Sequence, residues 1–262
     1  MAERTGKIIA LHLNYPSRTA ERGRSPKAPG YFLKPRTSLA FNGGSAERPA
    51  GCELMAYEGE IALIIGKTAR RVSLEDAWEH VAWVTASNDL GAYDLRHADK
   101  GANVRSKGGD GFTPVGPNLL PAADLDPAAL RIRTWLNDEL VQDDTTADLL
   151  FPFATLVSDL SQLLTLEPGD MILTGTPAGA SVCFPGDTVS VEVTTLDESK
   201  TTGKLTTSIT AGDVALPPYS AQPQVDELQK AEAWGSRRPA SDLPKPVLTP
   251  ELKAKLMGVA TA

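Results

Sequence analysis

The chain has 262 residues, of which 41% are hydrophobic and 23% are charged, and its formal net charge is -7 at pH 7. This length suits one large domain or two small ones, and the composition is typical of a soluble globular protein. The acidic balance disfavours a nucleic-acid-binding protein, which normally presents a basic face. Because no run of about 18 apolar residues and no basic-then-apolar leader occurs, we expect no membrane span, no signal peptide and a cytoplasmic location.

Short strand patterns and polar connections alternate in the first part of the chain. Residues 7–11 (KIIAL) and 31–34 (YFLK) have the apolar character of strands. The polar, basic stretch 16–29 between them is typical of a surface loop or lid rather than of a packed element. Residues 57–66 (YEGEIALIIG) then alternate as a strand does, although this strand carries two glutamates.

The middle of the chain combines one short helix, one strand and a long polar stretch. Ser73 and Asp76 resemble a capping box, which predicts a short helix over 74–80. Residues 81–86 (VAWVTA) have the composition of a strand. The polar, glycine-rich stretch 91–111 is predicted to be a long loop, and loops of about 20 residues in a compact domain are uncommon and usually functional.

Further along, the elements are predicted with clearer patterns. Two strands, 131–136 and 139–142, flank an Asn-Asp turn and suggest a hairpin, and apolar residues at helical spacing predict a helix over 152–164. Each of two PGD turns precedes a strand, 171–175 and then 188–193.

Composition divides the chain into three parts. Residues 1–50 form an N-terminal segment with the lid loop, 51–215 form the core, and 216–262 form a proline-rich tail or linker. Within the tail, Thr249 is a predicted N-cap, with Pro250 at the first position of a brief helix.

Two like charges, Glu58 and Glu60, stand two positions apart in the strand pattern and therefore share one face. Carboxylates about 5 Å apart repel by roughly 3 kcal/mol at an effective dielectric near 20. The pair is thus exposed on an edge strand, protonated on one partner, or neutralised by a cation. Asp89, directly after the next strand, favours the cation, because three carboxylates suit Mg²⁺ or Mn²⁺. With three histidines in the chain, zinc is the weaker choice.

The same alternation predicts how the rest of this strand is oriented. Glu58 and Glu60 share their face with Ala62 and Ile64 and should line a cleft. The remaining large side chains are expected to pack behind the sheet: Tyr57, Ile61, Leu63 and Ile65.

Six stretches resemble, in order, those of the fumarylacetoacetate hydrolase superfamily: YEGEIALIIG, ASNDLGAYD, RSKGGDGFTPVGP, TTADLLF, LTLEPGDMILTGTPAG and PGDTVSVEV. The resemblance covers residues 31–193, and TTADLLF and KGGDGFTP point to the decarboxylase and isomerase branch of the homoprotocatechuate pathway. It implies a mainly β fold of the α+β class, with a mixed β-roll or β-sandwich core and a few short helices. It also implies a homodimer.

The resemblance implies roles for particular residues. Glu58, Glu60 and Asp89 match the three ligands of a Mg²⁺ or Mn²⁺ ion. Lys107 matches a lysine near the substrate oxygen, and Thr176 matches a contact to the substrate carboxylate, made through its hydroxyl or its backbone N–H. Four further candidates for substrate binding are Arg36, Tyr93, Arg96 and Asp110.

The chain departs from the family hydrolases at two places. Those enzymes carry a histidine and, three residues later, a glutamate that activate water, whereas this chain has Arg18 and Glu21. Arginine cannot act as a general base near neutral pH. Tyr93 stands where the family commonly has an arginine, so a carboxylate clamp is either missing or supplied by another residue: Arg96, Arg105 or Arg36.

These departures favour chemistry without an activated water, namely a metal-dependent decarboxylase or isomerase of small unsaturated oxo-dicarboxylic acids in aromatic catabolism. Lys107, Glu21 and Arg18 are its candidate catalytic residues, with Arg18 holding a distal carboxylate from a closing lid. The alternatives are an acylpyruvate hydrolase, such as one for fumarylpyruvate, and an oxaloacetate decarboxylase. A further alternative is a catalytically weak scaffold domain, because LTPELKAKLMGVATA resembles the first helix of an oxo-acid-aldolase type domain and suggests that the native polypeptide continues past Ala262.

Overall fold

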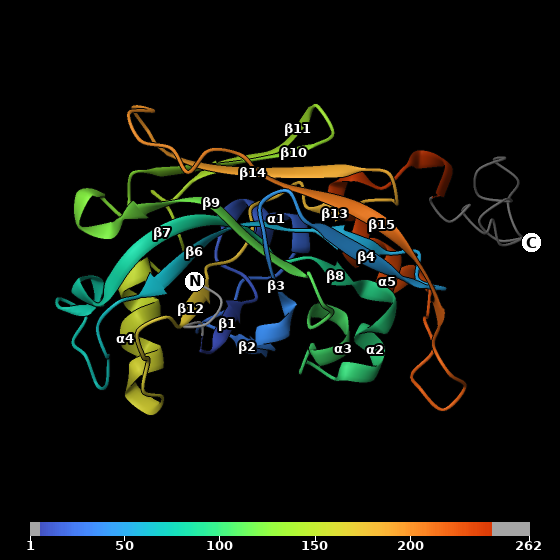
Figure 1. Cartoon of the computed structure of the whole chain (residues 1–262), viewed down its shortest axis with the longest axis horizontal. Coiled ribbons are helices and arrows are strands. Elements are labelled where there is room, and N and C mark those ends of the chain that lie inside the picture. Colours follow the sequence, from blue (N-terminus) through green and yellow to red (C-terminus); the bar gives the residue numbers. More distant parts are fainter. Residues whose placement is uncertain (1–5, 243–262) are drawn as a thin grey trace, which may run out of the picture.

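Three β-sheets with short helices at their edges form the structure, a computed structural model that describes residues 6–242 (Figure 1). In spatial order, the strands of the seven-stranded sheet are β2 (Tyr31–Lys34), β1 (Ile8–Leu11), β12 (Met171–Leu173), β6 (Gly59–Ile65), β7 (Val81–Asn88), β9 (Thr113–Pro121) and β3 (Leu39–Phe41). Those of the five-stranded sheet are β11 (Glu139–Thr145), β10 (Leu130–Leu136), β14 (Thr188–Thr195), β15 (Leu205–Ala215) and β4 (Ser45–Ala50). A small sheet contains β13 (Ser181–Val182), β5 (Met55–Tyr57) and β8 (Gly91–Ala92).

The helices are short. They are α1 (Pro16–Arg22), α2 (Arg96–Asp99), α3 (Val104–Lys107), α4 (Phe153–Leu163) and α5 (Glu227–Trp234). Single 3₁₀ turns occupy Arg36–Ser38, Ala77–His80, Tyr93–Leu95, Ala122–Asp124, Gly235–Arg237 and Ala240–Asp242. None of the helices between residues 6 and 242 combines the length and apolar character needed to cross a membrane.

Both large sheets are mixed. β1 pairs in parallel with β12, β3 with β9, and β15 with β4, whereas the other pairs are antiparallel. Strands dominate, and they are joined by short connections rather than by regular crossover helices. The expected α+β class, mainly β with a few short helices, is confirmed.

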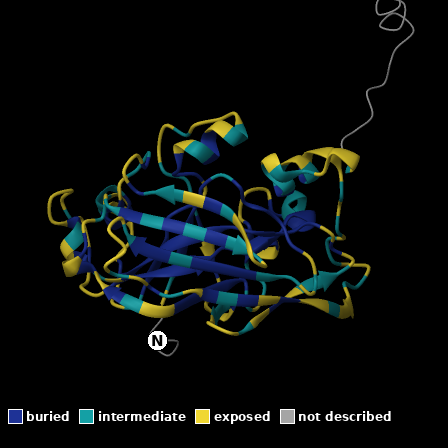
Figure 2. Ribbon diagram, turned by 90° about the horizontal axis from the view of Figure 1, so that it is seen from above, coloured by how far each residue is buried: buried dark blue, intermediate teal, exposed yellow. Residues whose placement is uncertain are grey.

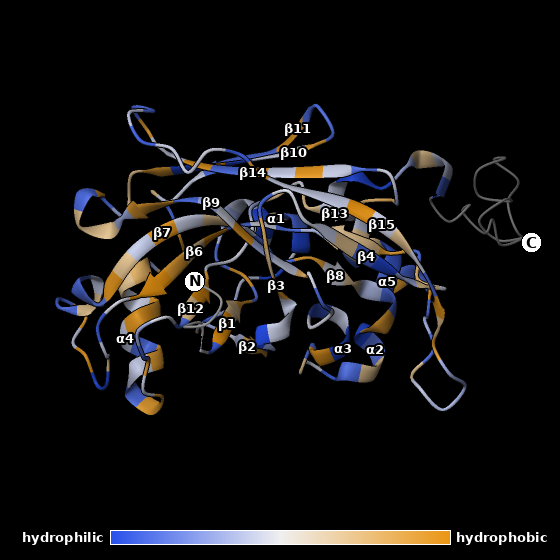
Figure 3. Cartoon of the chain, in the orientation of Figure 1, coloured by the Kyte–Doolittle hydropathy of each residue, from blue (hydrophilic) through white to orange (hydrophobic). Residues whose placement is uncertain are grey.

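The main hydrophobic core lies where β6 faces the five-stranded sheet. Its members include Ile61, Leu63 and Ile65 of β6, together with Ile132 of β10 and Val191 of β14. The opposite side of β6 is buried too, since Ala62 and Ile64 pack in a second cluster with β1 and β12. Figure 2 shows the resulting buried interior, and Figure 3 shows hydrophobic residues concentrated in β6, β7 and α4. The predicted alternation along β6 is therefore confirmed.

Most predicted strands and the long helix are present. β1, β2, β7, β12 and β14, the hairpin of β10 and β11, and α4 all lie where their patterns indicated. The hairpin turn places Asn137 at φ 55°, a left-handed conformation that asparagine tolerates well. The capping contact between Ser73 and Asp76 also forms, at 2.9 Å, but it precedes a 3₁₀ turn rather than an α-helix.

Two predicted loops are instead regular structure. Stretch 16–29 contains α1, because Pro16 occupies its first turn and Gly23 ends it at φ 62°. Stretch 91–111 contains β8, a 3₁₀ turn, α2 and α3. Helix α5 was not predicted from the tail sequence, and the helix expected at Thr249 lies outside the described residues.

Asp226 begins α5 by accepting a hydrogen bond from the backbone N–H of Gln229 at 2.8 Å. We expect Asp226→Ala to lower the free energy of unfolding by about 1 kcal/mol, because the first turn loses its side-chain acceptor. The free energy of unfolding of Asp226→Asn should stay close to that of the parent protein, because asparagine keeps an acceptor oxygen. Urea denaturation of the three proteins measures the difference, and equal losses in both variants would contradict a capping role.

Candidate metal centre and cavity

Three buried carboxylates converge at the end of β6 and β7. Glu58 precedes β6, Glu60 lies within it and Asp89 follows β7, and the two strands pair so that Glu60 stands opposite Ser87. One oxygen from each carboxylate lies within 4.8 Å of the others. The strand pairing thus brings together the three residues that the sequence predicted as metal ligands.

Glycine at position 59 allows the two glutamates to stand this deep in the fold. A Cβ built on Gly59 would lie 2.0 Å from Oγ1 of Thr134 in the facing sheet. The backbone N–H of Gly59 also donates to Gln142 Oε1 at 3.0 Å. The E-G-E pattern therefore combines two carboxylates with a close contact between the sheets.

The three carboxylates have different electrostatic surroundings. Burial alone would raise the pKa of Glu58, but the cations of Lys107 and Arg18 lower this pKa to about 2. Burial and the neighbouring charges of Asp89 and Glu58 raise the pKa of Glu60 well above its usual value. Among residues 6–242, Glu60 accepts a hydrogen bond only from the backbone N–H of Gly175, at 2.8 Å.

This donor set fits a hard divalent cation. The three carboxylates are buried oxygen ligands, and Glu60 makes no ion pair among the described residues. The cluster therefore provides the negative charge and the ligand type that Mg²⁺ and Mn²⁺ bind. The prediction that Glu58 and Glu60 are not an exposed charged edge is confirmed, because both side chains are buried.

Two buried lysines contact the carboxylates, and both of them pair with Asp89. Lys107 Nζ lies 2.8 Å from Glu58 Oε2 and 3.0 Å from Asp89 Oδ2. Lys34 Nζ pairs with Asp89 Oδ1 and donates to the Phe112 carbonyl at 2.9 Å. Burial opposes the charge of both lysines, but Asp89 and Glu58 raise the pKa of Lys107, whereas that of Lys34 stays lowered.

The sequence did not predict Lys34 as a site residue. Its position two residues after Phe32 in β2 places both side chains on the buried face of this strand. A lysine at a buried strand position needs an acidic partner, which is the signal that would have found it. Residue Asp89 is that partner, 55 positions away.

Helix α1 forms one wall of the site. Arg18 is buried and pairs through Nη1 with Oε2 of Glu21, while its Nη2 lies 4.0 Å from Glu58 Oε1. The other oxygen of Glu21 accepts the Ser236 backbone N–H at 2.8 Å. Despite burial, these contacts to Ser236 and Arg18 lower the pKa of Glu21. Arg18 and Glu21 are thus paired rather than solvated, so the expectation of a surface loop was wrong for residues 16–22. Beyond the helix the expectation is confirmed, because Arg24, Ser25 and Lys27 are exposed and irregular.

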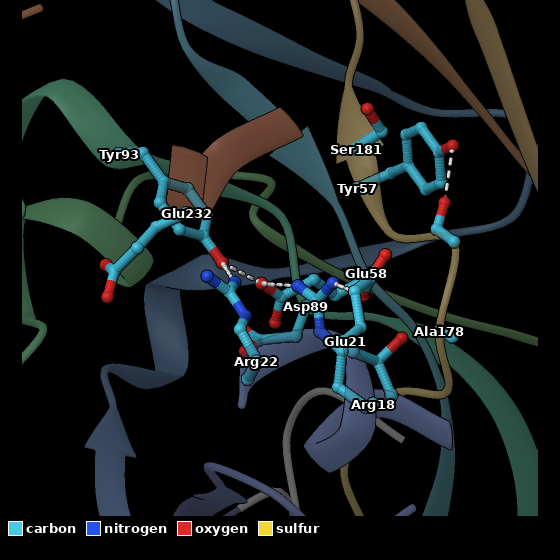
Figure 4. A network of polar contacts seen from close by, with 12 residues as sticks. Arg18, Glu21, Arg22, Tyr57, Glu58, Asp89, Tyr93, Ala178, Ser181 and Glu232 are labelled. Atoms are coloured by element: carbon cyan, nitrogen blue, oxygen red, sulfur yellow. Dashed lines mark hydrogen bonds and ion pairs between the residues drawn. The ribbon is translucent and has the colours of Figure 1, made fainter. Parts of the chain in front are cut away.

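Tyr93 and Arg96 form the adjoining wall. The Tyr93 hydroxyl donates to Glu58 Oε1, and it accepts from Arg22 Nη2 at 3.1 Å. The Arg96 guanidinium lies 4.7 Å from the centroid of the Tyr93 ring and pairs with Glu232. Figure 4 shows Arg18, Arg22 and Tyr93 gathered around Glu58.

A cavity lies between these walls, and both carboxylates and arginines contribute to its lining. The Thr176 hydroxyl, also in its lining, donates to the Gly59 carbonyl at 2.8 Å and accepts from Gln142 at 2.8 Å. The lining residues are Leu11, His12, Leu13, Arg18, Arg22, Arg24, Phe32, Glu58, Asp89, Tyr93, Arg96, Asn103, Lys107 and Thr176.

The structure does not bring every candidate to this cavity. Arg36 and Asp110 are exposed and lie outside the lining, as does Arg105, whose guanidinium is 3.5 Å from Asp99. Arg22 and Arg24, which the sequence did not single out, take part in the lining instead. They sit at the end of α1 and just beyond it, so their placement depends on a helix that was not predicted.

The chain is similar to known proteins of one family over most of its length. A family profile described as "Fumarylacetoacetate (FAA) hydrolase C-terminal" matches residues 7–210. The 4-hydroxyphenylacetate degradation bifunctional isomerase/decarboxylase of Salmonella dublin is 44% identical over 191 residues, which are 72% of this chain and 44% of that protein. The homoprotocatechuate catabolism bifunctional isomerase/decarboxylase of Escherichia coli is 42% identical over 190 residues, which are again 72% of this chain and 44% of that protein. The chain thus spans less than half the length of these relatives.

Two solved structures are similar over more of their length. The 5-carboxymethyl-2-hydroxymuconate delta-isomerase from Mycobacterium smegmatis is 36% identical, with a TM-score of 0.72, and the match covers 80% of this chain and 81% of that one. Maleylpyruvate hydrolase from Sphingobium sp. SYK-6, in complex with manganese (II) ion and pyruvate, is 33% identical, with a TM-score of 0.66. That match covers 80% of this chain and 72% of the other. Because the family profile spans most of the chain and includes the three clustered carboxylates, the chain belongs to the fumarylacetoacetate hydrolase family.

Proposed function

We propose that the chain is a divalent-metal-dependent decarboxylase or isomerase of small unsaturated oxo-dicarboxylic acids in aromatic catabolism. The observation that carries the proposal is one cavity with two chemically distinct parts. Two carboxylates and the lysine that contacts them, Glu58, Asp89 and Lys107, are among its lining residues, and so are the arginines Arg22 and Arg96. A molecule with an oxo-acid end and a second carboxylate would match both parts.

The chain's own residues would bind and orient such a substrate. Bound at Glu58, Glu60 and Asp89, Mg²⁺ or Mn²⁺ would supply Lewis-acid stabilisation of negative charge on the oxo-acid oxygens. Lys107 would donate a hydrogen bond to the oxygen that becomes negative as CO₂ leaves and the electron pair of the broken C–C bond enters the enolate. Since the Thr176 hydroxyl is engaged by Gly59 and Gln142, we assign its backbone N–H to the substrate carboxylate.

The arrangement of α1 supports decarboxylation over hydrolysis, because loss of CO₂ needs neither an activated water nor a side chain that removes a proton from carbon. Both oxygens of Glu21 are engaged, one by Arg18 and the other by Ser236, and its pKa is lowered. A carboxylate in that state is a weak base, and the Arg18 guanidinium cannot accept a proton. The names of the relatives, isomerase/decarboxylases at 42% and 44% identity, support the same choice.

A panel of three substrates tests the proposal. The purified protein with Mn²⁺ or Mg²⁺ is offered 5-oxopent-3-ene-1,2,5-tricarboxylate, oxaloacetate and fumarylpyruvate, while CO₂ release, C–C cleavage and enol absorbance are followed separately. We expect CO₂ release or a change in enol absorbance to dominate with the tricarboxylate. Dominant cleavage of fumarylpyruvate would instead support the hydrolase alternative, and metal binding without turnover of any substrate would support the scaffold alternative.

Lys107→Met should lower kcat by about 100-fold or more, the usual cost of removing one donor to a developing oxyanion. The affinity for Mn²⁺ should not fall, because the lysine cation competes with a metal for Glu58 and Asp89. Arg36→Ala is the matched control, since this exposed arginine lies outside the cavity lining. An unchanged kcat in Lys107→Met would remove the lysine from the chemistry.

The assembly and the location of the protein are proposals as well. We propose a homodimer, as the family resemblance suggests, and a cytoplasmic enzyme that binds a small oxo-acid rather than a nucleic acid. Size-exclusion chromatography with light scattering measures the oligomeric state directly.

A further inference from the structure

Residues 224–238, here called the C-terminal strap, follow the family-matched region and lie against the cavity walls. The strap includes α5 and is attached at both of its ends. The Gln224 backbone N–H donates to the Asp94 carbonyl at 2.9 Å, and the Ser181 hydroxyl donates to the Trp234 carbonyl at 2.9 Å. Ala233 is buried in a hydrophobic cluster that also contains Tyr93.

One end of the strap contacts the metal centre through α1. The backbone N–H of Ser236 donates a hydrogen bond to Glu21, and the Glu21 carboxylate pairs with Arg18. Nη2 of Arg18 in turn lies 4.0 Å from Glu58 Oε1. Gly235 allows this approach, because a Cβ there would lie 2.9 Å from Glu21 Oε1 and 3.2 Å from Arg18 Nη1. A residue with a side chain would have to displace the Arg18–Glu21 pair.

A second series of contacts starts from α5 itself. The Glu232 carboxylate pairs with Arg96, and Arg96 covers the Tyr93 ring. The Tyr93 hydroxyl then donates to the same Glu58 oxygen that Arg18 faces. Figure 4 shows Glu232 and Tyr93 on one side of the carboxylates and Arg18 with Glu21 on the other.

A free arginine side chain loses about 2 kcal/mol of rotamer entropy when it is ordered, so residues that order it in advance favour ligand binding. Glu58 is an alternative partner for both arginines, because it lies 4.0 Å from Arg18 and its charge also acts on Arg96. A carboxylate outside the cavity keeps the guanidinium from moving onto Glu58. Glu232 supplies that carboxylate for Arg96, whereas Glu21, which accepts the Ser236 N–H, fixes Nη1 of Arg18 while Nη2 stays 4.0 Å from Glu58.

We propose that the C-terminal strap is a positioning element, which orients Arg96 and Arg18 toward the distal carboxylate of the substrate and thereby sets a preference for oxo-dicarboxylates over oxo-monocarboxylates. This inference rests on the proposed function. Glu232 and Ser236 are positioning residues, because they act through the two arginines and do not line the cavity.

The test compares two oxo acids by calorimetry on the Mn²⁺-loaded protein. Pyruvate carries only the oxo-acid end, whereas 2-oxoadipate adds a distal carboxylate. We expect Glu232→Ala to weaken 2-oxoadipate binding by about 10-fold, the worth of one charge-assisted hydrogen bond, while pyruvate and Mn²⁺ affinities are preserved. The affinity of Glu232→Gln for 2-oxoadipate should lie between those of the parent protein and Glu232→Ala, because glutamine keeps a hydrogen-bond acceptor. Glu227→Ala on the same helix is the control, since Glu227 pairs with Arg238 at 2.8 Å away from the cavity lining.

The outcomes separate the strap from the proposed function. If the parent protein discriminates between the two acids and Glu232→Ala discriminates equally well, the strap proposal is overturned. If the parent protein binds neither acid, the proposed function fails and the substrate preference fails with it.

Hydrogen exchange of the metal-free protein tests the strap without any ligand. Gly235→Ala should speed exchange at the amides of residues 16–22, because the added Cβ crowds Glu21 and Arg18. Gly186→Ala is the control for backbone strain, since Gly186 also has a positive φ, 99°, but its Cβ would enter open space. Unchanged exchange of α1 in Gly235→Ala would overturn the role assigned to the strap.

Discussion

Glu60→Gln should lower the affinity for Mn²⁺ by at least about 100-fold, because even changes beside a metal ligand cost about 10- to 100-fold and this residue is itself a predicted ligand. Its carboxylate lies in the buried triad and has no cation of the protein within ion-pair distance among the described residues. The substitution keeps the shape of the side chain, so the loss would report charge and ligand type. Isothermal titration calorimetry with Mn²⁺ measures it.

The matched control is Asp110→Asn, which removes an exposed carboxylate outside the cavity lining and should leave Mn²⁺ affinity unchanged. The metal-free Glu60→Gln protein should also unfold at a higher temperature than the metal-free parent, because a neutral amide ends the repulsion with Glu58 and Asp89. Added Mn²⁺ should stabilise the parent and not the variant. Full Mn²⁺ affinity in Glu60→Gln would remove the carboxylate triad as the metal site.

The triad was predictable because each of its members follows from a local rule. Alternation along a strand puts Glu58 and Glu60 on one face, and Asp89 follows the next strand in the chain. Neighbouring strands in sequence often pair, as β6 and β7 do. Short sequence separation was therefore enough to predict that the three carboxylates meet.

The lysine that neutralises Asp89 follows no such rule. Lys34 lies in β2, at the edge of the sheet, and nothing in the periodicity of a strand names a partner 55 residues away. Periodicity indicates which face is buried, whereas the pairing of buried charges depends on the complete topology. The same limit applies to Glu232 and Arg96, which are 136 residues apart.

Helix α1 illustrates a different error, in which local signals were present but outweighed by composition. Pro16 at the start and Gly23 after the end are a helix-boundary pair, and Arg18 and Glu21 are spaced to interact on one helical face. The many charged and polar residues of this stretch favour, on composition alone, a loop exposed to solvent. Buried charges that are paired with each other give the same composition as solvated ones, so only their partners distinguish the two cases.

Lys34→Met should destabilise the metal-free protein by about 3 kcal/mol, because it removes one of the two lysines that pair with the buried Asp89 carboxylate and leaves Lys107 as the other. The lysine is buried and holds both the Asp89 carboxylate and the Phe112 carbonyl. Chemical denaturation measures the change, with Lys27→Met as the control, since Lys27 is exposed. Equal stability of the two variants would show that Asp89 does not depend on Lys34.

A double variant separates lost charge compensation from lost packing. Lys34→Met combined with Asp89→Asn should recover much of the stability that Lys34→Met alone loses, because the buried charge is then absent as well. Excess Mn²⁺ should reduce the defect of the single variant, since a cation at the triad compensates Asp89 in place of the lysine. The double variant should gain little from Mn²⁺, because it lacks one of the three carboxylates. A double variant as unstable as Lys34→Met, with no effect of Mn²⁺ on either, would mean that the lysine stabilises the fold through its packing alone.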